Sequence, residues 1–287
     1  MKRIALASLC IALGSTVMVP ALSHAEVSCT RPGLQQAVDL YIAAQSKGDP
    51  SALPLAKGVG YWENAAPAEL QKGFINRPMK IDHQRSFLDT DTCQSVTESI
   101  VTDKAAPFVF STRLRVNHDK IVEVEILWTT TGYWLFDADK YLQHSSEENW
   151  EAIAAEKRTP RGVLVAAANA YLDAFLEKRI DLVPWGFPCE RTEGGRGYTG
   201  KGSPADSCEV GVPAGVNIAN RHFVVDEVLG VVSVYCTFGA GGPNGGSGAP
   251  DNHTFRIENG KLRYVHTLTH LLQPKEGLTP PRPASKP

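Results

Sequence analysis

The chain has 287 residues and a formal net charge of −2, and 43% of its residues are hydrophobic. This balance excludes the strongly basic surface that is typical of nucleic-acid-binding proteins. The length suits two ordinary domains, each able to bury a core.

The first 25 residues have the pattern of a secretory leader. Lys2 and Arg3 precede an apolar run that ends in the small residues Ser23-His24-Ala25, so we expect cleavage after Ala25. No second run of about 18 or more apolar residues follows. We therefore expect a secreted or periplasmic protein that does not span a membrane.

Five cysteines follow the leader, in a compartment where disulfides persist. Cys189 and Cys208 bracket a glycine-rich stretch and would close it as a loop, and Cys29 could reach Cys93 in the same half of the chain. Cys236 lies in the apolar run VVSVYCTF, which favours a buried structural thiol over a nucleophile. Since no C-x-x-C pair occurs, we expect no zinc site built on cysteine.

An internal repeat with an offset of 130 residues organises the chain. The segment LQQAVDLYIAAQSKGDPSALPLA matches LVAAANAYLDAFLEKRIDLVPWG, so that Leu34 and Tyr41 correspond to Leu164 and Tyr171. Apolar residues recur at helical spacing in both segments, which predicts one helix per copy with a buried stripe. We interpret the two tyrosines as core residues with satisfied hydroxyl groups.

Each predicted helix is followed by a short strand that carries a carboxylate, Glu63 in YWEN and Glu193 in RTEG. Alternating strands come next, at 109–128 in the first copy and at 222–238 and 253–270 in the second. Turns are expected at His118-Asp119, at 228–230 and at Asn259-Gly260. A helix followed by a curved antiparallel sheet predicts an α+β fold in each copy.

The repeat and the segments between the copies give the expected domain boundaries. The first domain spans 27–144 and the second spans 161–272. Between them, 145–160 reads as a linker helix that opens at Ser145 or Ser146 and stops before Thr159-Pro160. The proline-rich tail 273–287 has no core-forming pattern, and we expect it to be disordered or extended.

These residues resemble the NTF2-like or SnoaL-like superfamily, and within it a secreted tandem-repeat group of fungi and bacteria. The resemblance rests on Tyr61-Trp62-Glu63-Asn64, on C-x-R-x-E-G from Cys189 to Gly194, and on F-x-V-V-D-E-x-x-G from Phe223 to Gly230. It implies two tandem cones, each with an apolar pocket between helices and a curved antiparallel sheet. Such cones usually work without a bound cofactor, by acid–base chemistry where they are enzymes.

The resemblance and the residues together favour a cofactor-independent lyase. The expected substrate is a small aromatic or phenolic molecule, such as a lignin-type β-aryl ether. Isomerase and dehydratase reactions are included in this expectation. The alternative is a non-catalytic secreted module that binds a small ligand. We expect no nucleic-acid or membrane partner, and a monomer or homodimer.

Strand alternation selects the candidate catalytic residues, because residues two apart share a face. Leu262, Tyr264, His266, Leu268 and His270 would lie together, and His266 is the first choice for a general base or acid, against the alternative of a hydrogen-bonded core histidine. Alignment on the turns places Glu125 at the equivalent position of the first copy. Arg191 and Glu193 would anchor an anionic or phenolic group or form a structural ion pair.

The remaining candidates are placed around the same predicted pocket. His222 is a further catalytic candidate at the mouth of the sheet, although a solvated side chain is the simpler interpretation. No metal site is expected, because His222, His253 and His266 lack H-x-H or H-x-x-x-H spacing. The candidate substrate-binding residues are Tyr235, Tyr264, His253, Glu63, Glu125 and Trp128.

The stretch GGRGYTGKGS, 194–203, is similar to a phosphate-binding loop but lacks its essential partners. Gly202 stands where a magnesium-binding hydroxyl is required, and no helical pattern follows. We therefore expect a surface loop near the mouth of the second cone, and a second one at 239–250, which together could act as a lid.

Overall fold

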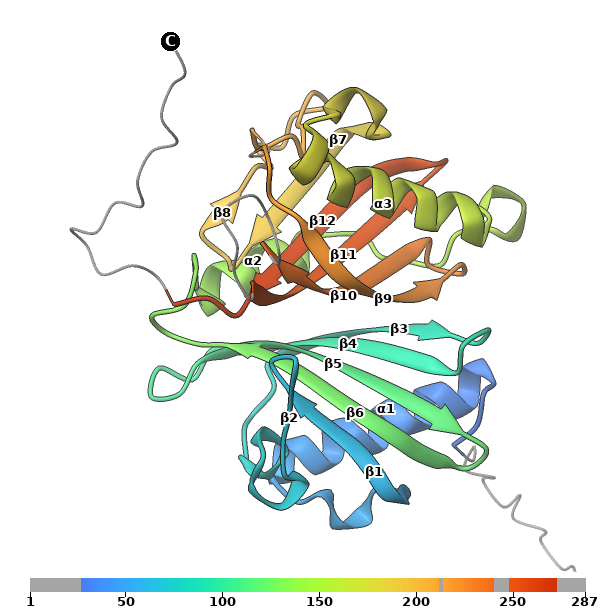
Figure 1. The fold of residues 1–287 in the computed structure, drawn as a ribbon, viewed down its shortest axis with the longest axis vertical. Coiled ribbons are helices and arrows are strands. Elements are labelled where there is room, and N and C mark those ends of the chain that lie inside the picture. Colours follow the sequence, from blue (N-terminus) through green and yellow to red (C-terminus); the bar gives the residue numbers. More distant parts are fainter. Residues whose placement is uncertain (1–26, 212–213, 240–247, 273–287) are drawn as a thin grey trace, which may run out of the picture.

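A computed structural model describes residues 27–211, 214–239 and 248–272, and within them the chain folds as two similar halves (Figure 1). Each half has one long helix followed by a six-stranded sheet, which confirms the expected α+β class. The expected leader and tail lie outside these residues. The elements of the first half are α1 (Arg31–Lys47), β1 (Leu55–Glu63), β2 (Ala66–Pro67), β3 (His83–Asp89), β4 (Gln94–Val101), β5 (Phe108–Asn117) and β6 (Lys120–Thr129).

The second half repeats this order after an intervening helix, α2 (Ala138–Glu147). Its elements are α3 (Arg161–Glu177), β7 (Trp185–Glu193), β8 (Gly197–Tyr198), β9 (Ile218–Asp226), β10 (Val231–Phe238), β11 (Ala249–Glu258) and β12 (Lys261–Thr269). The sheets have the same strand order, β2-β1-β6-β5-β4-β3 and β8-β7-β12-β11-β10-β9. In each sheet one parallel pair, β1 with β6 and β7 with β12, joins otherwise antiparallel strands.

The helices begin, end and pack as the repeated pattern predicts. Thr30 caps α1 by accepting a hydrogen bond from the backbone N–H of Gly33, and Gly48 ends the helix with a φ of 64°. The hydroxyl groups of Tyr41 and Tyr171 are hydrogen-bonded to Thr112 (2.7 Å) and to Arg191 (3.0 Å). Both tyrosines are fully buried, so packed side chains fill the space between helix and sheet in which the family resemblance places a pocket.

The predicted hairpin turns are confirmed. His118 lies between β5 and β6 with a φ of 55°, and Asn259-Gly260 between β11 and β12 has φ values of 52° and 72°. Asparagine and glycine are the residues that reach this left-handed region most readily. The turn between β9 and β10 ends at Gly230, which also has a positive φ.

The linker between the halves differs from the expected helix at 145–160. The helix α2 comes earlier, at Ala138–Glu147, because Asp137 caps it by accepting from the backbone N–H of Lys140. Ser145 and Ser146, the expected start, lie in its last turns. After it, 148–154 has no regular secondary structure, and a single 3₁₀ turn covers Ala155–Lys157.

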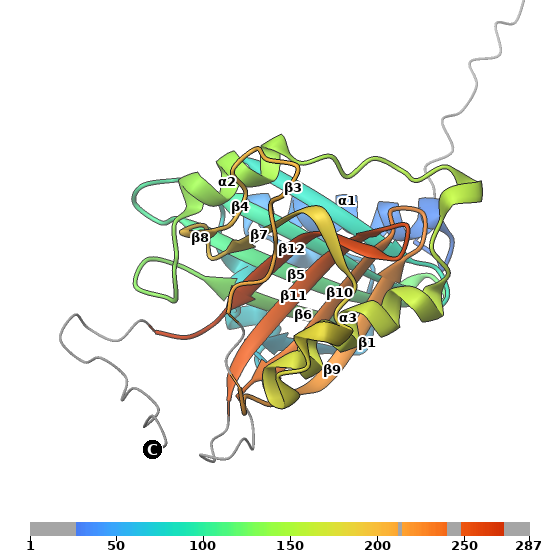
Figure 2. The same ribbon diagram turned by 90° about the horizontal axis from the view of Figure 1, so that it is seen from above.

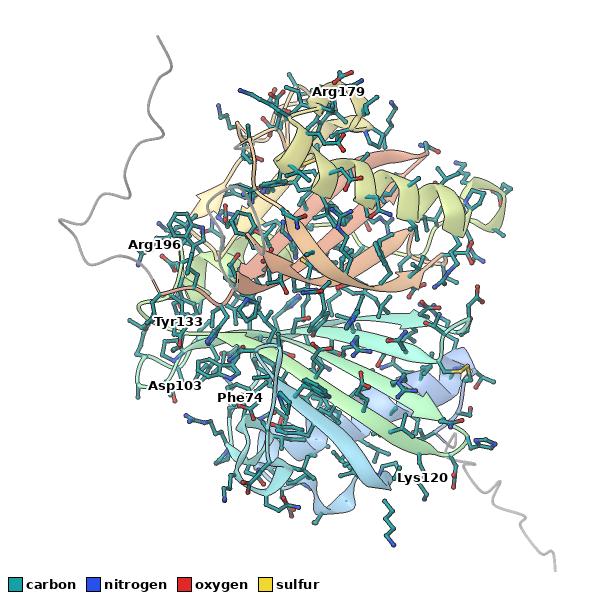
Figure 3. The ribbon with its side chains drawn as sticks, in the orientation of Figure 1. Phe74, Asp103, Lys120, Tyr133, Arg179 and Arg196 are labelled. Atoms are coloured by element: carbon teal, nitrogen blue, oxygen red, sulfur yellow. A yellow bond between two sulfur atoms is a disulfide. The ribbon has the colours of Figure 1, made fainter. Side chains whose placement is uncertain are left out.

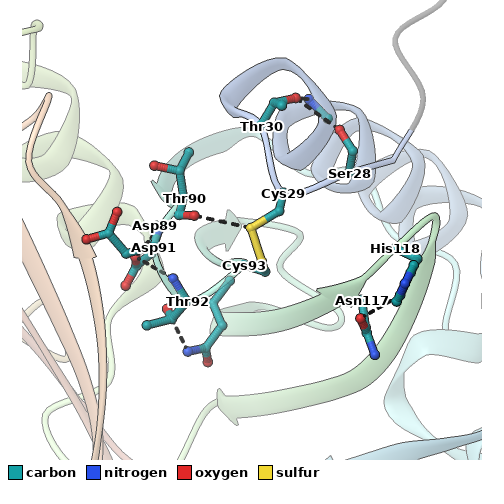
Figure 4. The surroundings of a disulfide bond; sticks show 12 residues. Ser28, Cys29, Thr30, Asp89, Thr90, Asp91, Thr92, Cys93, Asn117 and His118 are labelled. Atoms are coloured by element: carbon teal, nitrogen blue, oxygen red, sulfur yellow. Dashed lines mark hydrogen bonds between the residues drawn. A yellow bond between two sulfur atoms is a disulfide. The ribbon is translucent and has the colours of Figure 1, made fainter.

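Both predicted disulfides are present. Cys29–Cys93 ties the segment before α1 to the turn between β3 and β4 (Figure 4). Cys189–Cys208 joins β7 to the end of the glycine-rich loop. Cys236 is unpaired and buried, as expected.

The two sheets pack against each other through the faces that do not carry α1 and α3, which gives four layers in the order helix, sheet, sheet, helix (Figures 1 and 2). Figure 3 shows side chains of both halves filling this junction, with Tyr133 at one end of it. An apolar cluster occupies the interface and includes Phe87, Leu127, Val224 and Leu268. We call this layer the inter-sheet interface.

Two ion pairs cross the inter-sheet interface and repeat each other. Arg31 binds Asp226 with two bonds of 2.8 and 2.9 Å, and Arg161 binds Asp89 with bonds of 2.9 and 2.7 Å. Asp226 also accepts from the backbone N–H of Leu88, and Asp89 from that of Val225. Each half thus gives one arginine and one aspartate, the reciprocal pattern of a two-fold interface, here formed within one chain.

Candidate functional site

The inter-sheet interface contains two equivalent positions, related by the repeat. In β3 and β4, Arg85 is the register partner of Glu98, and in β9 and β10, His222 is the register partner of Tyr235. The first pair faces His266 of β12. The second pair lies near Glu125 of β6, the residue that sequence alignment makes equivalent to His266.

The first position, which we call the closed socket, is filled by the segment that follows α2. The Glu148 carboxylate lies 2.8 Å from Nε2 of His266, and the Glu98 carboxylate lies 3.0 Å from Nδ1. The ring of Trp150 stacks on Tyr264 at 5.4 Å, and the Arg85 guanidinium lies 4.5 Å above Trp150. Only about 10 Å³ of space remains beside His266, room for one water molecule at most.

His266 is a buried cation in this arrangement. Burial lowers its pKa, but the carboxylates of Glu148 and Glu98 raise it by more, so that the pKa is about 9. Both ring nitrogens lie against carboxylates, and 1% of the side chain is exposed. The imidazole therefore links β4, the linker and β12 as an ion pair, and no cavity large enough for a substrate adjoins it.

The second position, which we call the open socket, contains a cavity of about 380 Å³. Both halves line it, the first with Trp62, Arg113 and Glu125, the second with His222, Tyr235 and Asp251. This volume lies within the usual range for small-molecule sites, about 300 to 1,000 Å³. Three of these residues, Glu125, His222 and Tyr235, are sequence-predicted candidates that the structure brings together.

Arg113 fixes the carboxylates of the open socket. Its Nε and Nη2 donate to Oε2 of Glu125 at 2.9 and 2.7 Å, while Nη2 also pairs with Glu123 and Nη1 donates to Gln94 at 2.6 Å. Trp62 lies beside Glu125 because these residues are register partners in β1 and β6. The cavity wall carries one arginine, Arg113, and three carboxylates, those of Glu123, Glu125 and Asp251.

The other predicted residues lie in separate places. Arg191 donates to Glu193 at 2.6 Å and to Tyr171, while the Trp134 indole N–H donates to Glu193 at 2.7 Å. Arg191 is 5% exposed, and this group joins β7 to the segment between β6 and α2.

The first-copy counterpart, Glu63, accepts from the Tyr61 hydroxyl at 2.6 Å and from the backbone N–H of Phe74. Trp128 stacks on Phe74 at a centroid distance of 5.8 Å, and the His270 ring packs against its edge.

His253 and Cys236 lie in the core of the second half. Nδ1 of His253 is 3.0 Å from Asp251. Burial and the Asp251 carboxylate raise the pKa of the Cys236 thiol well above its usual range, which agrees with the interpretation that it is not an activated nucleophile.

One part of the predicted face is wrong. Tyr264, His266 and Leu268 do share a face, but it is the face at the inter-sheet interface, and Leu262 packs on the α3 side. The pairing of β12 with β7 shifts register between Leu262 and Tyr264, so alternation does not continue through the bulge.

Several residues of the two sockets were not among the candidates predicted from the sequence. Glu98 and Glu148 are 168 and 118 residues from His266, so their pairing depends on the packing of the halves. Trp150 and Arg85 likewise meet only because the segment after α2 packs against β3. Arg113 was reachable in principle, since it lies opposite Glu125 across the predicted hairpin at His118.

The glycine-rich loop does not form a phosphate site within the described residues. Gly197-Tyr198 forms the strand β8, and Asp206 accepts from the backbone N–H groups of Lys201 and Ser203. No helix follows in the described residues up to β9. Of the second expected loop, 240–247 lies outside the part that the structure describes.

Comparison with known families gives one match. A family model described as a domain of unknown function (DUF8021) matches residues 157–269, which runs from the 3₁₀ turn just before α3 to the end of β12. A search of curated proteins finds no match for the chain. In the part of the chain with described coordinates, no helix has the length and apolar character needed to cross a membrane. The two disulfides are compatible with an extracellular protein.

Proposed function

We propose that this protein binds a small ring-bearing molecule with hydrogen-bond donors, of the phenolic kind, in the open socket. The observation that carries the proposal is the difference between two equivalent positions. In the closed socket the linker supplies an indole and a carboxylate that fill the space, whereas the open socket is a cavity of about 380 Å³.

The walls of the open socket suit such a ligand. Trp62, Leu127 and Pro250 offer apolar and aromatic surface, and Trp62 is 37% exposed. Both bonds from Arg113 to Glu125 end on Oε2, so Oε1 is the oxygen offered to a ligand hydroxyl. A few oriented polar groups on a largely apolar wall are typical of small-molecule sites.

A cofactor-independent lyase is the second candidate function. It is favoured by the imidazole of His222, the hydroxyl of Tyr235 and the carboxylate of Glu125, which line one cavity. His222 is exposed at the cavity and would act as the general base or acid. A phenolic β-aryl ether is the substrate to test, as the NTF2-like resemblance implies. The repeated α+β halves are compatible with that resemblance.

The direct test is calorimetric titration of the mature chain with a methoxyphenol and with a phenolic β-aryl ether dimer. We expect Trp62→Ala to weaken binding about tenfold, because stacking area is lost from an exposed wall. Glu125→Gln should weaken it by a similar factor, because the charged acceptor is lost. The matched controls are Leu182→Ala and Glu156→Gln, which change exposed residues away from the socket and should leave affinity unchanged.

The same samples separate binding from catalysis. If wild type releases phenol from the ether and His222→Ala binds the ether but does not release it, the lyase is supported. Binding without product in wild type would support the binding module. Failure of both ligands to bind folded wild-type protein, or equal affinity in Trp62→Ala, would overturn the open socket as a phenolic site.

A further inference from the structure

Three metal-ligand side chains converge in the core of the second half. Cys236 of β10 and Asp251 and His253 of β11 place their ligand atoms within 4.8 Å of one another. Asp251 and His253 are two apart on one strand and share a face, and Cys236 is the register partner of Asp251. All three side chains are buried, with Asp251 at 0% exposure.

The distances between these atoms resemble the edges of a zinc tetrahedron. Sγ of Cys236 lies 3.9 Å from Nδ1 of His253 and 3.9 Å from Oδ2 of Asp251, and Nδ1 lies 3.0 Å from Oδ2. Tetrahedral Zn²⁺ with ordinary bond lengths requires about 3.6 Å from sulfur to nitrogen or oxygen and about 3.3 Å from nitrogen to oxygen. Shifts of a few tenths of an ångström would therefore suffice.

The same geometry argues against a nucleophilic triad. In such a triad one imidazole nitrogen faces the carboxylate and the other faces the nucleophile. Here the single nitrogen Nδ1 faces both Asp251 and Cys236. Three ligand atoms gathered this closely are an arrangement that a cation can use.

We propose that Cys236, Asp251 and His253 form a Zn²⁺ site. The surroundings hold the ligands in place: the Thr269 hydroxyl donates to Oδ1 of Asp251 at 2.9 Å and leaves Oδ2 for the metal, and the His253 ring stacks on Phe255. A divalent cation would also compensate a carboxylate buried in an apolar core.

The site adjoins the open socket, because Cys236 and Asp251 also line that cavity. A fourth ligand, water or a donor atom of a bound molecule, would complete the coordination, as in sites that keep an open position. The metal site does not depend on the phenolic ligand proposed above, since its three ligands come from the chain.

The test is a titration with Co²⁺, whose absorption spectrum reports on its coordination. The mature protein is first treated with a chelator, and its Cys236 thiol is shown to be reduced. We expect one Co²⁺ per chain, a thiolate-to-cobalt band in the near ultraviolet, visible bands of tetrahedral intensity, and displacement by one equivalent of Zn²⁺. This measurement uses wild type and so does not depend on whether any variant folds. An absent thiolate band, or no stoichiometric binding, would overturn the site.

Variants then assign the ligands. Cys236→Ser should abolish the thiolate band, and Asp251→Asn should weaken Zn²⁺ binding more than about a hundredfold. Thr269→Val should weaken Zn²⁺ binding about ten- to a hundredfold, because it removes the hydrogen bond that orients the Asp251 carboxylate. The matched control His118→Gln alters an exposed histidine in the turn between β5 and β6, away from the cluster, and should bind as wild type does. Unchanged affinity in folded Asp251→Asn would place the metal elsewhere and contradict the proposal.

Discussion

The imidazole of His266 is held between two carboxylates, and its ionisation should control the pH dependence of stability. Its pKa is raised from 6.5 to about 9, so its stabilising contribution is complete below about pH 6.5 and is lost as the pH rises through 9. Glu98 and Glu148 have lowered pKa values because, although burial opposes it, His266 favours their charged forms. The contribution of these two carboxylates to the free energy of unfolding is lost as the pH falls through their lowered pKa values and they become protonated.

We therefore predict that the free energy of unfolding of wild type falls by about 2–3 kcal/mol between about pH 6.5 and about pH 10. His266→Gln should be less stable at neutral pH and should lose most of this dependence, since the titrating cation is gone. Urea unfolding across this range measures both, with His222→Gln, an exposed histidine, as the control. Parallel pH profiles for wild type and His266→Gln would contradict the ion-pair assignment.

At the scale of elements, the segment after α2 acts as an internal plug of the closed socket. Trp150 is 8% exposed and packs against Phe87, Tyr264 and His266. We predict that Trp150→Ala lowers the free energy of unfolding by about 3 kcal/mol, because large-to-small changes in a packed site leave a cavity. Trp62→Ala, its matched control in the open socket, should cost less than about 1 kcal/mol. Equal losses in urea unfolding would show that the sockets do not differ as described.

The elements were predictable where the signal is local. Helical spacing and the Asn259-Gly260 turn depend on neighbouring residues, and the 130-residue offset repeats such local patterns in the second copy. The structure confirms the elements they predict. The predicted position of the linker helix was wrong because Ser145 and Ser146 are also good N-cap residues. Asp137 caps the helix instead, and its backbone N–H is held by the carbonyl of Gly194 in the second half, a contact that the sequence does not show.

The site was less predictable because it belongs to the packing of two sheets. Sequence reasoning named Glu125 from the alignment of the two copies, His222 from its place at the start of a strand and Tyr235 from its aromatic side chain, but it assigned them to pockets within each half. Their meeting, and the capture of His266 by Glu98 and Glu148, require the face-to-face arrangement of the halves. Long-range pairs of this kind leave no periodic pattern in the chain.

At the scale of the whole molecule, the tandem halves satisfy within one chain the reciprocal contacts of a two-fold dimer. This agrees with the expectation that the protein can be a monomer, which remains a prediction to be tested by sedimentation. The reciprocal ion pairs Arg31–Asp226 and Arg161–Asp89 show this arrangement directly. Both aspartates have 0% side-chain exposure, so each depends on the arginine of the other half.

The reciprocity predicts equal energetic roles for the two arginines. Arg31→Ala and Arg161→Ala should each lower the free energy of unfolding by about 2–3 kcal/mol, less than for a fully buried pair because the arginines are partly exposed. The control Arg179→Ala breaks an exposed pair with Asp181 and should change stability by less than about 1 kcal/mol. Urea unfolding measures all three.

Combining Arg31→Ala with Arg161→Ala should also uncouple the halves, since each pair joins one half to the other. We expect the single cooperative transition of wild type to separate into two when unfolding in urea is followed by intrinsic fluorescence and by circular dichroism. Losses no larger than that of Arg179→Ala, together with a single sharp transition in the double variant, would mean that the apolar inter-sheet cluster alone holds the halves together.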